Sequence, residues 1–369
     1  METLAAVFRS VGAPLSIERI LLDDPEPSEL VVRVAAVGLC HTDYHVMRGE
    51  RRVAMAPMVL GHEAAGVVEA VGADVTSMKP GDHVVLTFIP GCGVCRWCRQ
   101  GLHHLCAEGS RITRGPQLDG SYRRRDQSGA EVGAFCMIGG FAERTVVDQA
   151  SAIVIDKDIP LDLASLVACG VPAGVGAARY RAKVKAGDSV LVVGCGGDGM
   201  NVVQGARLCG AAKIIAADIV AAKLEWAMEF GATDTINAQG ETLTRQVLKL
   251  TGGFGVDHAF VCIDPPATLL AAFRATAKAG NVVVTALTPD TVTEIKIPPL
   301  ELFVTQKAVM GAVYGFASPR LQIPELLALY RKGSLNLRRL VTRTYRLEDI
   351  NRGYADLDAG KNIRGVVVF

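Results

Sequence analysis

The sequence predicts an α/β protein of two domains, one irregular and rich in β-strands and the other built on a parallel sheet. The first domain is indicated by short apolar segments between Gly and Pro turns in residues 1 to about 170, as at Leu30–Val37, Ala65–Val71 and His83–Phe88. The second is indicated by apolar strands that alternate with helical segments from near Gly170 onward, as in βαβ units. A chain of 369 residues is long enough for two such domains.

The alternation after residue 170 predicts individual elements. Apolar runs predict strands at Ser189–Val193, Lys213–Ala217, His258–Ile263 and Asn281–Ala286. Helical spacing between them predicts helices at Met200–Cys209, Ala221–Phe230 and Ala267–Ala277. A later helix and a last strand are expected at Ile323–Lys332 and Gly365–Phe369. We therefore expect a first domain of residues 1–170 completed by 313–369, and a second domain of residues 171–312.

Composition and charge limit the classes of function. The formal net charge is +1, so the chain lacks the basic surplus that favours binding to nucleic acid or to an anionic membrane. The densest basic run, Arg123-Arg124-Arg125, is expected to lie in a solvated loop. The start of the sequence shows no signal-peptide pattern, and no run of about 18 apolar residues occurs. We expect a cytoplasmic protein in which clustered cysteines are metal ligands rather than disulfides.

Four cysteines in one short segment form the strongest motif. The spacing C-x2-C-x2-C-x7-C is made by Cys92, Cys95, Cys98 and Cys106. Tetrahedral zinc with four thiolates takes its ligands from such a tight loop, and a site of this kind is closed to water and therefore structural. An iron–sulfur cluster also uses grouped cysteines, although the C-x2-C-x2-C-x3-C-P run of ferredoxins is not met. Uncoordinated thiols are the third alternative.

A second set of metal ligands is indicated near Gly38-Leu39-Cys40-His41-Thr42-Asp43-Tyr44-His45. Cys40 offers one ligand, and His62 is the natural second, with Glu63 beside it as a carboxylate behind the ligands. Catalytic zinc needs a third protein ligand and one open position, and Cys169 at the predicted domain junction is the candidate. Taken alone, Cys169 fits an apolar packing role better, because free cysteines are commonly buried.

A glycine-rich motif follows the apolar run at Ser189–Val193 and precedes a predicted helix: Gly194-Cys195-Gly196-Gly197-Asp198-Gly199. In this context G-x-G-x-x-G predicts a turn that holds the pyrophosphate of a dinucleotide. Asp218 ends the next strand, about 20 residues further on, where a carboxylate holds the adenosine ribose. Because Asp218 would repel a 2′-phosphate, NAD is favoured over NADP. Lys223 could reach the same ribose.

These motifs together resemble the zinc-dependent medium-chain alcohol dehydrogenases over essentially the whole chain, including the closing Lys361-Asn362-Ile363-Arg364-Gly365. The resemblance implies an irregular GroES-like β catalytic domain and a Rossmann doubly wound parallel-sheet domain. It also implies two zinc ions per chain. The catalytic ion would be held by Cys40, His62 and Cys169, and the structural ion by Cys92, Cys95, Cys98 and Cys106.

The resemblance assigns further roles. Thr42, the ribose hydroxyls of the cofactor and His45 would form a proton relay, and Asp43 and Glu63 would stand behind the zinc ligands. The cofactor pyrophosphate would be contacted by His41 and Arg364. The alcohol channel would be lined by Phe88, Phe135 and Cys136, beside a long segment from about 111 to 138.

Four segments look like the bacterial nicotinoprotein alcohol dehydrogenases, namely Leu118–Arg123, Cys169–Pro172, Leu340–Tyr345 and Asn362–Val366. Those enzymes keep NAD(H) bound and recycle it with a second substrate, such as an aldehyde or the artificial acceptor nitrosodimethylaniline. Asp198 departs from the wider family, in which an aliphatic residue is usual at this position. A local structural role for Asp198 and a role in cofactor retention or redox balance are both open.

The expected function is zinc-dependent oxidation of a primary alcohol to an aldehyde, and the reverse, with hydride transfer to NAD that stays bound. The open alternatives are an NAD-exchanging alcohol dehydrogenase, a glutathione-dependent formaldehyde dehydrogenase, which usually lacks a match for His45, and a non-enzymatic binding protein of the same fold. The expected partners are a small alcohol or aldehyde and a second small electron acceptor. A homodimer or homotetramer is expected, without nucleic acid or membrane.

Overall fold

The computed structural model describes residues 1–238, 242–263 and 266–369, which form two compact units. The first unit comprises Met1–Cys169, Ser318–Ala328 and Leu337–Phe369, and the second comprises Gly170–Ala317 and Leu329–Asn336. The predicted domain limits differ from this division at Gly170 and in residues 313–317 and 329–336. The latter segment packs on the second unit, where Asn336 N donates to Gln204 Oε1 (2.7 Å). Arg207 Nη2 likewise donates to Ser334 O (2.6 Å).

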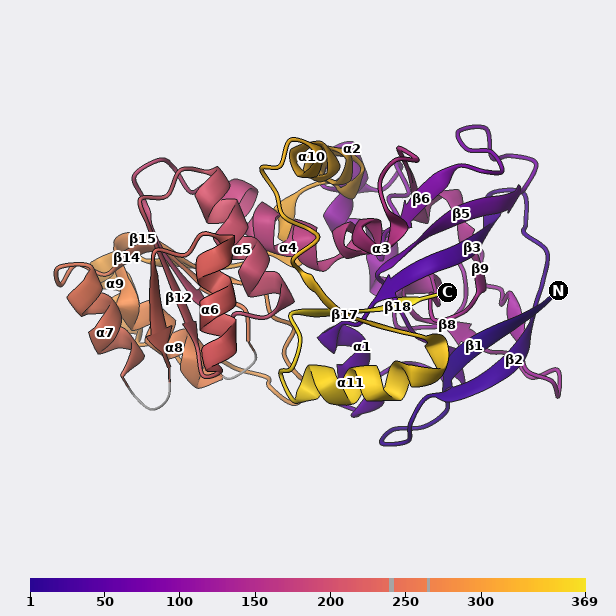
Figure 1. Ribbon diagram of the computed structural model, residues 1–369, viewed down its shortest axis with the longest axis horizontal. Helices are drawn as coiled ribbons and strands as arrows, with labels where there is room; N and C mark the ends of the chain where they lie inside the picture. The colour runs from indigo at the N-terminus through magenta and orange to yellow at the C-terminus, as the bar shows by residue number, and fades with distance from the viewer. Residues whose placement is uncertain (239–241, 264–265) are drawn as a thin grey trace. The chain divides into compact units, whose positions relative to one another are not determined.

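Two β-sheets form the body of the first unit (Figure 1). One has the order β7-β2-β1-β4-β8, and the other has the order β10-β6-β5-β3-β18-β17 with β9 paired to β3. Their strands are β1 (Glu2–Phe8), β2 (Ser16–Leu22), β3 (Glu29–Gly38), β4 (Met58–Val59), β5 (Ala64–Val71), β6 (His83–Leu86), β7 (Arg124–Arg125), β8 (Gly133–Ala134), β9 (Arg144–Asp148), β10 (Ala152–Ile155), β17 (Val341–Tyr345) and β18 (Arg364–Val368).

The chain's last strand completes the sheet that holds its early strands. β18 pairs antiparallel with β3, with Val366 opposite Gly38, and parallel with β17. Apolar side chains from both sheets and from α11 (Ile350–Asp358) share one core. The other helical segments of this unit are α1 (His41–Met47), α2 (Arg96–Arg99), α3 (Leu161–Ala164), η1 (His103–Leu105), η2 (Ala107–Arg111), η3 (Phe135–Met137), η4 (Gln149–Ser151), η5 (Ser165–Ala168), η8 (Leu347–Asp349) and most of α10 (Pro319–Arg331).

The second unit is a parallel six-stranded sheet with the order β13-β12-β11-β14-β15-β16 and helices on both faces (Figure 1). This confirms the predicted doubly wound fold. Its strands are β11 (Ser189–Val193), β12 (Lys213–Asp218), β13 (Asp234–Asn237), β14 (Val256–Val261), β15 (Thr276–Val284) and β16 (Ala308–Gly311). Its helices are α4 (Gly170–Gly176), η6 (Ala177–Ala182), α5 (Gly197–Leu208), α6 (Ala221–Phe230), α7 (Leu243–Leu250), α8 (Pro266–Ala275), α9 (Pro299–Thr305) and η7 (Val313–Phe316).

The predicted elements are present, with shifted ends. The strand at Ser189–Val193 and the helix at Ala221–Phe230 have the predicted bounds. β14 and β15 begin earlier than predicted, because Val256 pairs with Thr276 and so extends the ladder beyond the continuous apolar runs. That pairing also ends α8 at Ala275, before the predicted end of the helix.

The basic run Arg123-Arg124-Arg125 is not the solvated loop that we expected. Arg123 is 5% exposed and Arg124 is 1% exposed. Arg123 Nε donates to Glu29 Oε2 (2.6 Å), and Arg124 Nη2 donates to Ile138 O (2.8 Å) and to Thr145 Oγ1. The expectation was wrong because these buried acceptors lie far away in the sequence, and a basic run read locally does not reveal them.

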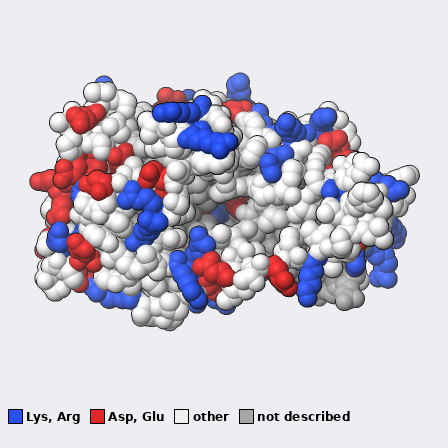
Figure 2. All heavy atoms as spheres, turned by 180° about the vertical axis from the view of Figure 1, so that it is seen from behind, with Lys and Arg blue, Asp and Glu red and all other residues white. Residues whose placement is uncertain are grey.

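Surface charge and helix hydropathy give two further observations. Lys and Arg side chains lie interspersed with Asp and Glu over the face seen in Figure 2, as the net charge of +1 suggests. Among the described residues, no single helix is both long and apolar enough to cross a membrane. One pair of helical segments, Leu161–Ala168 and Gly170–Ala182, reaches that length and hydropathy together but is bent by 55°.

Candidate active site and metal centres

Cys40 lies where strand β3 passes directly into helix α1. It is the N-cap of α1, with extended backbone angles, and Leu39 N donates to Gly365 O (2.9 Å) to hold the strand end. The neighbouring Gly38 leaves space that the site requires, because a Cβ atom there would lie 2.2 Å from Glu63 Oε2. The local sequence therefore places a thiol at the end of a strand and keeps room behind it for a carboxylate.

The three predicted ligands of the catalytic zinc come together in the first unit. One donor atom each from Cys40, His62, Glu63 and Cys169 lies within 4.8 Å of all the others. His62 is 1% exposed and lies between β4 and β5, whereas Cys169 ends the helical segment η5. Three segments that are distant in the sequence thus supply two thiols and an imidazole to one small volume.

Electrostatic contacts orient His62 and activate Cys40. Asp43 Oδ2 lies 2.9 Å from His62 Nδ1, and Gly61 N donates to Asp43 Oδ1 (2.9 Å). Burial alone would lower the pKa of His62, but the charges of Asp43 and Cys40 raise it well above its usual value. Hydrogen bonding with the Cys169 thiol, helped by His62, holds the pKa of Cys40 well below its usual range against the effect of burial. A thiolate is thereby favoured at the position of the first ligand.

Glu63 and Arg364 form a buried ion pair behind these donors. Arg364 Nη2 donates to Glu63 Oε2, and their side chains are 7% and 0% exposed. Burial raises the pKa of Glu63 to about 7, although the Arg364 guanidinium opposes the shift. Glu63 Oε1 has no hydrogen-bond partner among the residues that the structure describes. The family resemblance implies that Arg364 contacts the cofactor pyrophosphate. In the structure, Arg364 forms an ion pair with Glu63 within the first unit.

The donor set fits a zinc ion. Two thiols and an imidazole are preferred zinc ligands, and three protein ligands leave one coordination position open, as in catalytic sites. Ionised Cys40 and Cys169, with the carboxylates of Asp43 and Glu63, would place several negative charges in a buried volume. A divalent cation would balance them, whereas burial without one would be costly.

Two of the predicted channel residues pack against His62, a candidate metal ligand. The ring of Phe88 lies 5.7 Å from the His62 ring and that of Phe135 lies 5.9 Å from it, both edge-on. Cys136 is 1% exposed with φ at +57°, and burial raises the pKa of its thiol to about 12. The structure thus brings the aromatic residues to the candidate site, while Cys136 is a neutral apolar neighbour at this position.

Helix α1 holds the predicted relay residues. Thr42 Oγ1 lies 3.6 Å from Cys40 Sγ. His45 is one turn further along, is 6% exposed, and has Nδ1 2.6 Å from Glu50 Oε2. His41 is exposed, with its ring centroid 6.4 Å from that of His45. One short helix therefore presents a hydroxyl beside the metal ligands and a histidine on the way to the surface.

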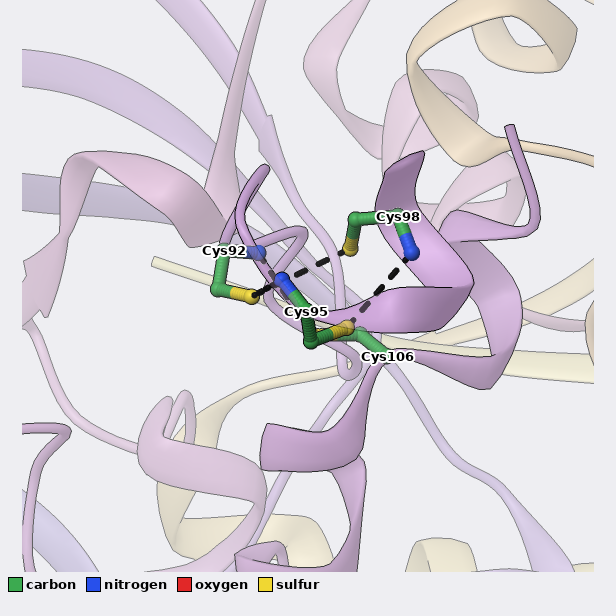
Figure 3. Close-up of side chains that lie close together, drawn as sticks. All are labelled: Cys92, Cys95, Cys98 and Cys106. Carbon is green, nitrogen blue, oxygen red and sulfur yellow. Dashed lines mark hydrogen bonds between the residues drawn. The ribbon is translucent and has the colours of Figure 1, made fainter. Parts of the chain in front are cut away.

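The four-cysteine motif folds into a compact lobe. The sulfurs of Cys92, Cys95, Cys98 and Cys106 all lie within 4.8 Å of one another and point toward a common centre (Figure 3). The Sγ atoms of Cys92 and Cys98 are 4.0 Å apart. Tetrahedral zinc at about 2.3 Å from each sulfur would separate the sulfurs by roughly 3.8 Å. This spacing suits a single ion and leaves no room for a multi-iron cluster.

Backbone amides prepare this lobe for thiolates. Cys95 N donates to Cys92 Sγ (3.4 Å), Cys98 N to Cys95 Sγ (3.5 Å) and Cys92 N to Cys106 Sγ (3.5 Å). The backbone amides of Ala107 and Cys98 lower the pKa of Cys95 to about 6. Burial raises the pKa of Cys98 to about 12, so that a cation is needed to hold all four sulfurs ionised.

The glycine-rich turn joins β11 to α5 in the second unit. Gly194 has φ at +93°, and a Cβ atom on Gly199 would lie 1.8 Å from Gly194 O. Gly196, the N-cap of α5, has no atom within 4 Å of where its Cβ would be. The turn therefore needs glycine for its tight path and leaves an open approach to the amide groups at the start of α5. These groups suit the pyrophosphate of a dinucleotide.

Asp218 closes this turn from the end of β12. Its Oδ2 accepts from Cys195 N (2.8 Å) and its Oδ1 accepts from Val220 N (2.9 Å). Lys223 lies in the first turn of the following helix, and its charge lowers the pKa of the Cys195 thiol, which burial raises overall. Asp198 lies in the first turn of α5, and its charge, after the larger effect of burial, helps to raise the pKa of Cys262 to about 12. Cys262 directly follows β14, so Asp198 and Asp218 lie toward the ends of different strands.

Comparison with known proteins assigns the family. Residues 26–157 match the alcohol dehydrogenase GroES-like domain, and residues 197–332 match the zinc-binding dehydrogenase domain. The chain is 43% identical over 370 residues to an NDMA-dependent alcohol dehydrogenase from Amycolatopsis methanolica, with 100% of this chain and 99% of that protein covered. The chain belongs to the zinc-binding alcohol dehydrogenase family.

Two solved structures share the fold of this alcohol dehydrogenase. A zinc-binding domain alcohol dehydrogenase protein from Burkholderia ambifaria is 36% identical with a TM-score of 0.95, and coverage is 100% of this chain and 99% of that one. Benzyl alcohol dehydrogenase from Acinetobacter calcoaceticus is 30% identical with a TM-score of 0.94 and the same coverage. Family membership confirms the predicted fold class, the predicted zinc-dependent alcohol dehydrogenase activity, and zinc and NAD as its cofactors.

Two residues of this alcohol dehydrogenase site were missed by sequence reasoning. Tyr354 on α11 is 1% exposed, and its ring stacks on Tyr44 at 5.7 Å. Burial raises the pKa of its hydroxyl well above the usual value, with the charges of Asp43 and Cys40 adding to the effect. No spacing signal reveals Tyr354, because α11 reaches the site only through folding. The other missed residue is Glu50. One feature of the sequence could have indicated it, because an acidic residue follows His45 closely at the end of a short helix.

Proposed function

We propose that this alcohol dehydrogenase oxidises a primary alcohol to an aldehyde, and performs the reverse reaction, at Cys40, His62 and Cys169 with NAD that it retains. The main support is the convergence of donor atoms from these three side chains within 4.8 Å of one another. Zinc held by three protein ligands would keep one coordination position open. Aromatic rings at Phe88 and Phe135 beside His62 favour a substrate with an apolar body. All ten cysteines are free thiols, which supports a reducing compartment such as the cytoplasm.

The chain's own residues have distinct roles in this proposal. Zinc held by the three ligands would act as a Lewis acid that lowers the pKa of a bound alcohol, and NAD would accept the hydride. Thr42, 3.6 Å from the Cys40 sulfur, takes up the hydroxyl proton. His45 receives that proton and passes it outward. The ribose hydroxyls of bound NAD would connect Thr42 to His45. Asp43 keeps His62 oriented through their 2.9 Å contact.

Cofactor binding is proposed at the glycine-rich turn and at two basic residues. The start of α5 at Gly194–Gly199 would hold the pyrophosphate, and Asp218 with Lys223 would hold the adenosine ribose, because Asp218 ends β12 next to the turn. His41 and Arg364 are proposed as additional pyrophosphate contacts. Arg364 also donates to Glu63, so it would either leave this ion pair to bind the pyrophosphate or contact both groups at once.

Retention of NAD is supported by the 43% identity to a protein that is named for its dependence on NDMA. The test is to denature purified, extensively dialysed protein and to quantify released NAD and NADH. About one nucleotide per chain would support the proposal, and a second small acceptor would then regenerate the cofactor. An empty protein that needs added NAD would support a conventional NAD-exchanging alcohol dehydrogenase instead.

Two cysteine variants test the separate roles of the two zinc sites. Cys40→Ser should abolish turnover and lower the zinc content from two ions toward one, while the circular dichroism spectrum and the melting temperature change little. Cys95→Ser should lower the melting temperature or disturb assembly of the proposed homodimer or homotetramer, because the four-cysteine lobe has a small core of its own. Equal activity loss with equal destabilisation in both variants would contradict the assignment.

A further inference from the structure

His45, the histidine of the proposed proton relay, is paired with Glu50, a carboxylate to which the family resemblance gives no role. His45 lies in the last turn of α1, with Nδ1 2.6 Å from Glu50 Oε2. The His45 side chain is 7% exposed and the Glu50 side chain is 27% exposed. The pair thus connects a buried imidazole to a carboxylate that reaches solvent.

The position of Glu50 is fixed by several contacts. Its backbone N–H donates to His45 O (2.8 Å), so the chain turns back on the end of α1. Its second carboxylate oxygen, Oε1, is 2.8 Å from Arg48 Nε. A carboxylate that is held at both oxygens and at its own amide is already oriented before substrate arrives.

Other charged or titratable groups also lie around the pair. Arg48 bonds Glu50 and also approaches Asp358 Oδ1 at 3.5 Å. The ring of His41 has its centroid 6.4 Å from that of His45, and Arg51 N also donates to His45 O (3.1 Å). Of these groups, Glu50 makes the shortest contact with the imidazole, at 2.6 Å from Nδ1, so it is well placed to orient the ring.

The chemistry of imidazole gives this contact a consequence. A neutral histidine has one N–H and one bare nitrogen, and the partner of one nitrogen decides the state of the other. An ionised carboxylate can only accept, so the proton of neutral His45 resides on Nδ1 and points to Glu50. Nε2 is then the bare nitrogen and can accept a proton from the cofactor ribose.

We propose that Glu50 is a positioning residue for proton transfer, which selects the Nδ1–H tautomer of His45 and takes over that proton on its way to water. The inference rests on the proposed relay through Thr42 and His45. In alcohol oxidation the O–H proton reaches His45 Nε2, the resulting imidazolium gives its Nδ1 proton to Glu50, and Glu50 releases it to solvent. The hydride goes to the retained NAD, so oxidation of one alcohol yields one aldehyde, one bound NADH and one proton. Reduction of the second acceptor reoxidises this NADH and uses the same proton path in reverse, which returns His45 to the Nδ1–H tautomer.

Glu50→Gln tests the role of the carboxylate with little change in size. The glutamine amide can donate to Nδ1 and would favour the opposite tautomer, in which Nε2 cannot accept a proton. We expect alcohol oxidation to slow by about tenfold or more. The pH dependence of alcohol oxidation should change as well, because the variant removes a negative charge 2.6 Å from the imidazole. Glu50→Asp, which keeps the charge, should restore much of the rate.

A double-mutant cycle separates this role from a general structural effect. In a His45→Gln background, adding Glu50→Gln should cause no further loss, because Glu50 acts through His45. Glu18→Gln removes a carboxylate of similar exposure (24%) that pairs with Arg9 (2.6 Å) in the same unit, and it should leave the rate and the pH profile unchanged. Nitrogen-15 NMR of histidine-labelled protein should show the Nδ1–H tautomer for His45, identified by its absence in His45→Gln, and its loss in Glu50→Gln.

The outcomes distinguish a failure of the proposed relay through His45 from a failure of the proposed role of Glu50. If His45→Gln leaves alcohol oxidation unchanged, the relay itself is wrong. If His45→Gln slows the reaction while Glu50→Gln changes neither the rate, the pH profile nor the tautomer, the relay stands and the role of Glu50 is overturned. Additive losses in the double variant would also overturn it, since they would show that Glu50 acts independently of His45.

Discussion

At the scale of a single residue, Gly38 shows how a missing side chain shapes the metal site. A Cβ atom on Gly38 would lie 2.2 Å from Glu63 Oε2 and 3.0 Å from Arg364 Nη2. Gly38→Ala should therefore displace the buried ion pair and cost about 1–3 kcal/mol in unfolding free energy, together with part of the zinc content. Chemical denaturation and metal analysis measure both. Gly311→Ala, where a Cβ meets no atom within 4 Å, is the control and should change neither quantity much.

The contact between Asp43 and His62 should matter for metal affinity. Asp43 is fully buried, and its Oδ2 lies 2.9 Å from His62 Nδ1. Asp43→Asn keeps the shape and removes the charge, so zinc affinity should fall by about 10- to 100-fold. Competition with a chelator measures this. Asp82→Asn, which changes an exposed turn carboxylate, is the control, and equal affinities in both variants would contradict the role of Asp43.

The candidate zinc ligands can be proposed from the sequence because few residue types bind zinc and their motifs are specific. These motifs predict Cys40, His62 and Cys169, and the structure brings their donor atoms within 4.8 Å of one another and of Glu63. Residues that act through packing or through a local turn could not be predicted in this way. Tyr354 reaches the site only because α11 folds back on α1, which no local pattern encodes.

At the scale of an element, the segment that includes Arg123-Arg124-Arg125 depends on buried arginines. Arg124 is 1% exposed and donates to Ile138 O and Thr145 Oγ1, and burial lowers its pKa to about 10. Arg124→Met would remove the guanidinium from both acceptors, while Ile138 O keeps the hydrogen bond from Thr145 Oγ1. We expect a loss of about 2 kcal/mol in unfolding free energy. The neighbouring Arg125 has a side chain that is 42% exposed, and Arg125→Met should change stability by less than about 0.5 kcal/mol. Similar losses in both variants would contradict the distinction.

The start of helix α5 is the element on which the role of Asp198 can be tested. Its charge helps to raise the pKa of Cys262, so the carboxylate lies on the β14 side of the glycine-rich turn. If it favours the positively charged oxidised nicotinamide, Asp198→Val should lower the bound cofactor content and the ratio of NAD to NADH released on denaturation. Asp198→Asn should show the same change if charge is the cause. Unchanged content and turnover would instead support a local structural role.

Elements were predictable where local pattern and tertiary pairing agree. β11 and α6 have the predicted bounds because their apolar runs end at Gly194 and Gly231, where φ is positive. β17 was not predicted, because Val341–Tyr345 has exposed residues at its centre and is a strand only through pairing with β18. The same holds for the two-residue strands β4 and β8, which exist only as partners within a sheet.

At the scale of the whole molecule, the fold class could be predicted from the change in the pattern of secondary-structure elements near Gly170. Short β segments before that point and strand–helix alternation after it correspond to the two compact units. The return of the C-terminal chain to the first unit has a physical basis in the pairing of β18 with β3. The assignment of residues 329–336 to the second unit depends on hydrogen bonds to the side chains of Gln204 and Arg207. The pattern of apolar residues does not predict these bonds.

Retention of NAD should be visible in the stability of the whole protein. A ligand at 100 times its dissociation constant adds about 2.7 kcal/mol to the stability of the state that binds it. If NAD is retained, adding NAD to dialysed protein should leave the melting temperature unchanged, whereas stripping the nucleotide should lower it and readdition should restore it. An NAD-exchanging enzyme would show a rise on the first addition. NADP is the control for the stripped protein, because Asp218 at the end of β12 would repel its 2′-phosphate, so recovery with NADP would argue against Asp218 as the ribose ligand.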